Sequence, residues 1–349
     1  MFVALRDLRF ARGRFALMGA VIVLITLLVG LLSGLTAGLA RDNTSAVTGL
    51  SSSADHLAFA EPASGQSPSF TASQLPAGAV RSWAAQPGVT SAQPIAISTL
   101  NASAGDRTAA VSDFAVQGGS GPAPVAPGPD GVVLSTGAAQ DLEASAGDTV
   151  ELSGKRLKVT AVTGDDSYSH TPVVWTSLAA GQQGTVVALT TDGGADLAAG
   201  DRAAGTSTLS IDDSLSALPS YQAENGSLQL MRGFLFAISA LVIGAFFTVW
   251  TIQRSGDIAV LKALGASTPY LLRDALGQAV VMLTAGTLLG TGLAAGVGVL
   301  VPADVPFVLD PTTALAPAGV LILLGAIGAG LSVRRIAAVD PLTALGSAR

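Results

Sequence analysis

Four long uncharged stretches constrain this chain more than any other feature of its sequence. They cover residues 15–40, 233–253, 275–301 and 312–333, and none of them contains Asp, Glu, Lys or Arg. A helix of about 20 apolar residues crosses the hydrocarbon core of a bilayer. The sequence therefore predicts an integral membrane α-helical protein with four transmembrane helices.

The segment between the first two spans, residues 41–232, has a different composition. It is rich in Ser, Thr, Pro, Gly and Asp, and it carries 8 Lys and Arg against 18 Asp and Glu. We expect a helix within residues 71–86. Short β-like runs bounded by turn residues predict strands at 89–99, 132–134, 149–152, 157–162, 173–175, 186–189 and 206–211. The interpretation is an extracytoplasmic mixed α/β domain with a small sheet between helices 1 and 2.

The distribution of basic residues predicts the orientation of the chain. The segments 1–14, 254–274 and 334–349 together hold ten Lys and Arg against four Asp, whereas the loop 302–311 holds only acidic charges. Because basic loops stay in the cytoplasm, we expect a multi-pass plasma-membrane protein with both termini inside. Segment 1–14 would be a cytoplasmic amphipathic segment, 254–274 a cytoplasmic helix and 334–349 a tail.

Cleavage after Gly38-Leu39-Ala40 is an alternative for the first span, since small residues of this kind precede signal peptidase sites. The apolar region of a signal peptide is normally about 7–15 residues long, which is shorter than residues 15–40. We therefore expect the span to be retained. The net charge of -6 and the pI near 4.8 argue against nucleic acid as a partner and leave membrane lipid.

The sequence offers no catalytic or metal-binding motif. Cysteine is absent, there are two histidines, and Gly154-Lys155 lacks the spacing of a phosphate-binding loop. We expect no enzyme activity, no permanently bound cofactor and no metal site. The spans also lack the ionisable residues that ion-coupled transporters usually keep, so any transport would draw its energy from elsewhere.

Three glycines recur every fourth residue within the first span, namely Gly30, Gly34 and Gly38. This spacing places them on one face of a helix, where small residues allow two helices to approach closely. We expect a role in helix packing. Self-dimerisation through this face is a second interpretation, and the general abundance of glycine in this chain is the third.

Two motifs resemble the FtsX-like/MacB-type family of ABC transporter permeases. The segment Arg254-Ser-Gly-Asp-Ile-Ala-Val-Leu-Lys-Ala-Leu-Gly-Ala-Ser267 is similar to the family element R-x-x-E-I-(A/G)-x-L-(K/R)-A-(L/I)-G-A-S, with Asp257 in place of the usual Glu. The tail Arg334-Arg-Ile-Ala-Ala-Val-Asp-Pro-Leu-Thr-Ala-Leu345 resembles the family's C-terminal ending A-x-x-x-D-P-x-x-A-L. One span, a large outer domain and three further spans also match the family layout.

The resemblance implies a permease homodimer that works with two copies of a separate ABC ATPase. Residues 254–274 would then form the coupling helix on which the ATPase docks. The docking residues implied are Arg254, Asp257, Lys262 and the turn Gly265, Ala266 and Ser267. The alternative is an amphipathic helix that is anchored at the membrane surface by its charges.

Three further segments, residues 2–18, 168–175 and 219–226, look like the branch of the family that holds HrtB-type haem-efflux permeases and DevC-type exporters. This implies haem as a transported substrate, and candidate ligands are Tyr221, Glu224, Tyr168 and His170. Each has a structural alternative: an interfacial tyrosine, a solvated glutamate, or a histidine that only donates hydrogen bonds. The competing functions are an FtsX-like transmitter that regulates a cell-wall hydrolase, and a MacB-type exporter of lipids, lipoproteins or drugs.

Overall fold

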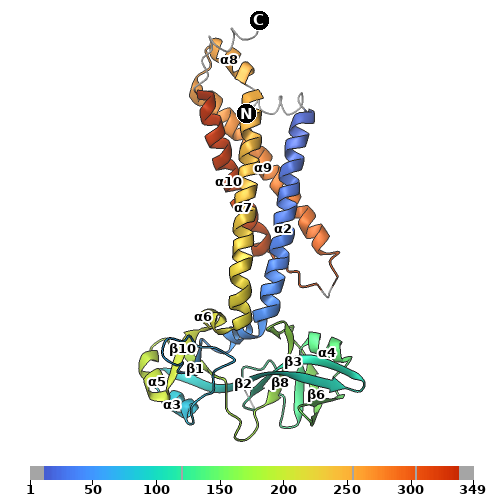
Figure 1. Cartoon of the computed structure of the whole chain (residues 1–349), viewed down its shortest axis with the longest axis vertical. Helices are drawn as coiled ribbons and strands as arrows, with labels where there is room; N and C mark the ends of the chain where they lie inside the picture. The colour runs from blue at the N-terminus through green and yellow to red at the C-terminus, as the bar shows by residue number, and fades with distance from the viewer. Residues whose placement is uncertain (1–11, 119–120, 254, 303–304, 338–349) are drawn as a thin grey trace. The chain divides into compact units, whose positions relative to one another are not determined.

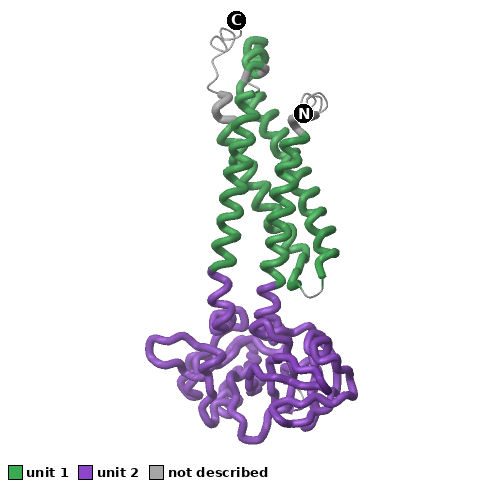
Figure 2. The backbone as a smooth tube through the Cα atoms, turned by 45° about the vertical axis from the view of Figure 1, so that its right-hand side comes forward, with its two compact units in different colours: residues 1–38, 227–349 green, residues 39–226 purple. Residues whose placement is uncertain are grey.

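The computed structural model describes residues 12–118, 121–253, 255–302 and 305–337. It divides into a helical unit, residues 1–38 and 227–349, and an outer unit, residues 39–226 (Figure 2). Four of the described helices are long and apolar enough to cross a membrane. The predicted fold class, four transmembrane helices with an α/β domain between the first and the second, is confirmed (Figure 1).

The helical unit contains most of the length of each of the four long helices. They are α2 (Arg12–Gly49), α7 (Pro219–Gln253), α9 (Thr268–Gly298) and α10 (Pro311–Ala337), with the short α8 (Ser255–Ala263) between α7 and α9. Each long helix buries a stripe of apolar residues in one shared core. That core includes Ile22 of α2, Phe247 of α7, Leu283 of α9 and Ala329 of α10. Large apolar side chains on the other faces are exposed, as expected for helices that contact lipid.

Helices α2 and α7 are longer than the uncharged stretches that predicted them. At 1.5 Å per residue, α2 with 38 residues and α7 with 35 are each about 50–60 Å long, against a hydrocarbon core of about 30 Å. Helix α2 continues past residue 40 because Ala46, Val47 and Leu50 are buried in the core of the outer unit. Helix α7 begins at Pro219, well before the uncharged stretch, and Pro is favoured in the first helical turn.

The outer unit is built on a sheet of ten strands among the described residues, in the order β10-β1-β9-β2-β3-β8-β4-β6-β5, with β7 paired to β8. The strands are β1 (His56–Ala60), β2 (Val89–Ala104), β3 (Arg107–Val116), β4 (Gly131–Leu134), β5 (Thr149–Leu152), β6 (Lys155–Val162), β7 (Ser167–Tyr168), β8 (Thr171–Ser177), β9 (Val186–Thr191) and β10 (Thr206–Ser210). Four short α-helices accompany them: α3 (Ala79–Ala84), α4 (Thr136–Leu142), α5 (Leu197–Ala204) and α6 (Ile211–Ser214).

The long strand β2 joins two halves of this sheet. Its first part pairs with β9, and its last part pairs with both β3 and β5. The additional β2–β5 pairing closes β2, β3, β8, β4, β6 and β5 into a ring, whose core includes Val111, Val132 and Leu142. The other half carries α3 and α5, and Trp83 of α3 is fully buried there and donates a hydrogen bond to Thr206 at 3.0 Å.

Three expectations about the elements were wrong. The sheet is large rather than small, because β1, β3 and the two-residue β7 were not recognised in the sequence. The helix expected within residues 71–86 is limited to α3, since Pro76 and Gly78 precede it. The single cytoplasmic helix expected over 254–274 is divided at the turn that the motif itself predicts, because α8 ends at Ala263 and Gly265 adopts a positive φ of 93° before α9 begins.

Candidate functional site

The turn between β7 and β8 has an unusual backbone. Tyr168 pairs with Thr171, so Ser169 and His170 form a two-residue turn, with φ values of 51° and 62°. Both lie in the left-handed region, which costs a non-glycine residue roughly 1–2 kcal/mol. Such a conformation persists only where surrounding contacts hold it.

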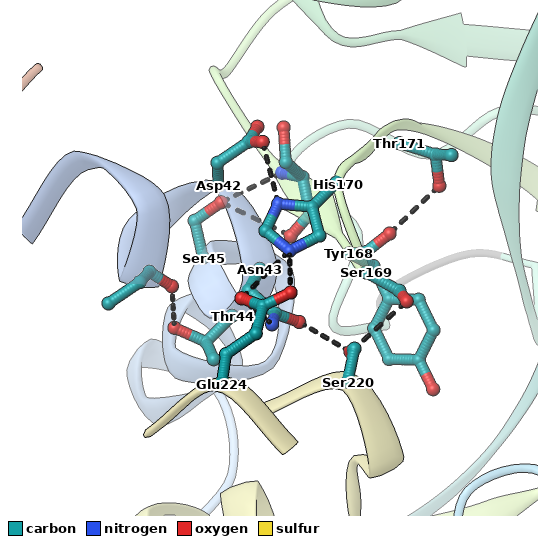
Figure 3. A network of polar contacts seen from close by, with 12 residues as sticks. Asp42, Asn43, Thr44, Ser45, Tyr168, Ser169, His170, Thr171, Ser220 and Glu224 are labelled. Carbon is teal, nitrogen blue, oxygen red and sulfur yellow. Dashed lines mark hydrogen bonds and ion pairs between the residues drawn. The ribbon is translucent and has the colours of Figure 1, made fainter. Parts of the chain in front are cut away.

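Those contacts come from the outer ends of α2 and α7, both within the outer unit (Figure 3). The backbone N–H of Ser169 donates to the carbonyl of Asn43 at 2.9 Å. The Ser169 hydroxyl donates to Ser220 at 3.1 Å, and Ser220 donates to Oδ1 of Asn43 at 2.7 Å. On the strand side, the Ser45 hydroxyl accepts from the backbone N–H of Ser167 at 2.8 Å.

His170 completes this network by bridging two carboxylates. Its Nδ1 lies 3.0 Å from Oδ2 of Asp42 on α2, and its Nε2 lies 2.9 Å from Oε1 of Glu224 on α7. Asn43 donates a further hydrogen bond to Oε2 of Glu224 at 3.2 Å. The side chains of His170, Asp42 and Glu224 are each about one-third exposed. The residues Asp42, Asn43, Ser169, His170, Ser220 and Glu224 are called the outer network below.

The electrostatics of the outer network favour a protonated ring. Partial burial lowers the pKa of His170, but hydrogen bonds to Asp42 and Glu224 and the charges of both carboxylates outweigh it and raise the pKa above the ordinary value. An ionised carboxylate only accepts hydrogen bonds, so a ring that faces one on each nitrogen binds both only as the imidazolium.

The two tyrosines among the candidate ligands, Tyr168 and Tyr221, contact the core of the outer unit. The Tyr168 ring lies edge-on to Phe70 and Phe114, and burial raises its pKa well above the ordinary value. The structure therefore separates Tyr168 from His170, the two residues expected to act as a pair, and brings His170 together with Glu224 instead (Figure 3). Tyr221 is partly buried and packs against the same core.

Sequence reasoning missed Asp42, Asn43 and Ser220. Asp42 and Asn43 lie just beyond the first apolar stretch, after Arg41, and because they are polar the predicted helix ended at residue 40 instead of continuing through them. An available signal was that Asn43, Ala46, Val47 and Leu50 repeat at helical spacing. No local pattern indicates the partners of His170, which are 128 and 54 residues away in the sequence.

The predicted ATPase-docking residues lie at α8 and the turn that follows it. Gly265 and Ala266 end α8 in a Schellman arrangement, because Ala266 N–H donates to the Leu261 carbonyl at 2.9 Å and Gly265 N–H to the Lys262 carbonyl at 3.0 Å. Ser267 then occupies the N-cap position of α9. Lys262 is partly exposed in the last turn of α8. Arg254 and the side chain of Asp257 lie outside the described residues.

The exposed surface of α8 is apolar as well as charged. Ile258 and Ala259 are buried against the helical unit, whereas Val260, Leu261 and Leu264 are exposed. Leu264 has 79% of its surface accessible. An exposed apolar patch at the end of a short helix is typical of a surface that a partner protein or the membrane covers, so it fits both interpretations of this segment.

The glycine face of α2 is covered within the helical unit. A Cβ built on Gly30 would lie 2.8 Å from the Cβ of Ala294 on α9, and one on Gly38 would collide with the carbonyl of Pro306. Gly34 faces the ring of Phe307. Helix α9 presents a matching small-residue stripe that we did not predict, in which Gly286 and Gly290 contact Ile22 and Thr26 of α2. Gly30 therefore packs against α9, and Gly34 and Gly38 pack against the segment that precedes α10, all within one chain.

Two family models match the chain. Residues 18–205 match the MacB-like periplasmic core domain, and residues 230–341 match the FtsX-like permease C-terminal region. The first match includes the outer network up to His170, and the second includes α8 and the glycines of α9.

Curated relatives include two proteins named putative hemin transport system permease protein HrtB. The one from Staphylococcus epidermidis (strain ATCC 12228 / FDA PCI 1200) is 32% identical over 142 residues, which is 41% of each chain. The one from Staphylococcus haemolyticus (strain JCSC1435) is 38% identical over 129 residues, which is 37% of each chain. The chain thus aligns with less than half the length of these relatives.

Two solved structures are similar to part of the chain at 12% identity. One is the extracellular domain of the noncanonic ABC-type transporter YknZ from Gram-positive bacteria, with a TM-score of 0.33, covering 45% of this chain and 98% of that one. The other is the periplasmic region of MacB from Actinobacillus actinomycetemcomitans, with a TM-score of 0.34, covering 46% and 90%.

Proposed function

Because the chain belongs to the family defined by the MacB-like periplasmic core domain and continues into an FtsX-like permease region, we propose that it is the membrane subunit of an ATP-driven exporter. The resemblance predicted from residues 254–267 is confirmed by these matches. The two relatives from Staphylococcus described above are named permease proteins of a hemin transport system. We further propose a homodimer that binds two ATPase subunits, with both termini in the cytoplasm.

The observation that carries this proposal is the length of α2 and α7. Each is one continuous helix whose outer turns belong to the outer unit and whose remaining turns belong to the helical unit. Helix α8 begins two residues after α7 ends. A force applied by an ATPase at α8 would therefore act on a rod that enters the outer unit directly. Because a helix is stiff along its axis, no further element is needed to carry the motion.

The cargo in this proposal is hydrophobic or amphipathic, and hemin is the specific candidate. The support is that two relatives are named hemin transport permeases, although they align over less than half their length. Tyrosinate and carboxylate oxygens suit ferric haem. Tyr221 and Glu224 lie one turn apart at the outer end of α7, so they remain the ligand candidates there. His170 would first have to release Asp42 or Glu224 before either nitrogen became a ligand.

The experiment is hemin-stimulated ATP hydrolysis by the full-length chain co-purified with a candidate ABC ATPase. We expect hemin to raise the rate severalfold and to bind with a Soret shift. Tyr221→Phe should weaken the stimulation, whereas Gln140→Ala, at an exposed position on α4 away from the predicted docking segment, should not. Failure of hemin to bind or stimulate would overturn the hemin assignment.

A separate outcome would overturn the exporter assignment as a whole. If no hydrophobic compound stimulates hydrolysis while a cell-wall hydrolase is retained on the outer unit, the FtsX-like alternative would replace export.

A further inference from the structure

The outer network joins three segments that are distant in the sequence. Asp42 and Asn43 come from α2, Ser169 and His170 from the β7–β8 turn, and Ser220 and Glu224 from α7. His170 is the central member because it alone contacts charged groups on both helices. We propose that His170 is a proton-operated clasp, which holds the outer ends of α2 and α7 together as the imidazolium and releases them when the ring loses a proton.

The geometry allows His170 to bind both carboxylates only when both ring nitrogens carry a proton. With both protons, Nδ1–H donates to Asp42 and Nε2–H donates to Glu224, at 3.0 and 2.9 Å. With one proton, the lone pair of the other nitrogen faces a carboxylate oxygen at hydrogen-bond distance. The cation between the two carboxylates is also lost, and like charges then repel.

Other titratable groups lie on the elements next to His170. On α2, Arg41 is adjacent to Asp42 and acts electrostatically on Asp166, which precedes β7. On α7, Tyr221 packs against the core. Tyr168 is buried and neutral over the accessible pH range. Burial and the neighbouring Asp165 raise the pKa of Asp166, despite the opposing effect of Arg41, but Asp166 does not contact the ring.

The sign of the pH response follows from the raised pKa of His170. Stabilisation by the clasp is complete below the ordinary histidine pKa, about 6.5, and is lost as the pH rises through the raised value. Strain adds to this release, since the left-handed turn at Ser169 and His170 is held partly by the same contacts. The clasp requires neither a cargo nor an ATPase, so it stands apart from the proposed function.

The chain is well suited to a spectroscopic test, because it contains no cysteine and only two histidines. Spin labels at Ser51→Cys, directly after α2, and Ala223→Cys on α7 would report the separation of the two helix ends in the full-length protein in lipid nanodiscs. Both positions are exposed. A reference pair is Gln140→Cys on α4 and Thr149→Cys on β5, both at exposed positions of the outer unit.

We expect the fraction of long distances between the first pair to roughly double from about pH 5.5 to about pH 9, while the reference pair does not change. His170→Gln should abolish the response, because its amide does not titrate, and His56→Gln should retain it. Histidine NMR should show that Asp42→Asn and Glu224→Gln each lower the titration midpoint of His170. An unchanged distance in the wild type, a response that persists in His170→Gln, or a midpoint unaffected by both carboxylate variants would overturn the clasp.

Discussion

The side-chain amide of Asn43 donates a hydrogen bond to Oε2 of Glu224 at 3.2 Å, across 181 residues of sequence. Asn43 is only 1% exposed, and its Oδ1 also accepts from Ser220. One buried amide on α2 therefore satisfies two polar groups on α7. This relationship, with the His170 bridge beside it, fixes the outer ends of the two longest helices within the outer unit.

Replacement of Asn43 should destabilise the outer unit. Asn43→Ala leaves Ser220 and Glu224 each without one partner, and we expect a loss of about 1–3 kcal/mol in the free energy of unfolding. Chemical denaturation of the purified protein measures this. Asn101→Ala, at an exposed position on β2, is the matched control and should change stability by less than about 0.5 kcal/mol. Equal effects of the two variants would contradict the role given to Asn43.

Asp113 should make stability fall as the pH rises. Burial raises the pKa of Asp113 from 3.8 to about 6, against a hydrogen bond from Thr176 at 2.7 Å that lowers it. The native state thus binds a proton more tightly than the unfolded chain, so stability is highest below the unfolded pKa and declines through about pH 6. A difference of about two pKa units between the folded and the unfolded state changes the free energy of unfolding by at most roughly 3 kcal/mol.

Asp113→Asn removes this decline, because the amide keeps an acceptor for Thr176 and carries no charge. We expect the variant to be about 1–3 kcal/mol more stable than the wild type near neutral pH and equal to it at about pH 4. Melting temperatures across this range provide the measurement. A variant less stable at every pH would show that the carboxylate charge is favourable at this site.

Two glycines of α9, two positions apart, should respond differently to alanine. A Cβ on Gly290 would lie 2.6 Å from the Cβ of Thr26 and 2.7 Å from the carbonyl oxygen of Val23, whereas nothing lies within 4 Å of one on Gly292. Gly290→Ala should therefore force α2 and α9 apart and cost about 1–3 kcal/mol, while Gly292→Ala should be tolerated. Thermal unfolding in detergent compares them, and equal melting temperatures would rule out close packing at Gly290.

Charge reversal at α8 should weaken ATPase binding. Lys262→Glu changes a partly exposed residue of the predicted docking surface, and Arg202→Glu makes the same change at an exposed position on α5 of the outer unit. We expect the first variant to retain severalfold less ATPase on co-purification and the second to retain the wild-type amount. Equal retention would place the docking surface elsewhere than Lys262.

The sequence predicted the membrane part of the fold well, because exclusion of charge from lipid leaves a long-range signal. The sequence predicted the ends of elements less well where packing overrides hydropathy. Helix α2 extends nine residues past the predicted boundary at 40, since Ala46, Val47 and Leu50 find a core that only the folded outer unit supplies. Strand β3 was missed because its neighbours in the sheet, β2 and β8, and not its own composition, define it.

The candidate site was predicted only in its parts. His170 and Glu224 were chosen for their chemistry, but their contact depends on a turn with two left-handed residues and on a helix that begins at Pro219. The docking turn at Gly265 was recognisable from its motif, because Gly after a helix is a local signal. The assignments of hemin and of the docking residues remain predictions.

ATP-dependent movement of hemin in inverted membrane vesicles that contain the full-length chain and its ATPase tests the proposed export function most directly. We predict that hemin accumulates inside the vesicles only when ATP can be hydrolysed, and that a hydrolysis-deficient ATPase abolishes accumulation. Hemin movement that is equal with and without ATP, in vesicles whose ATPase is active, would contradict the account.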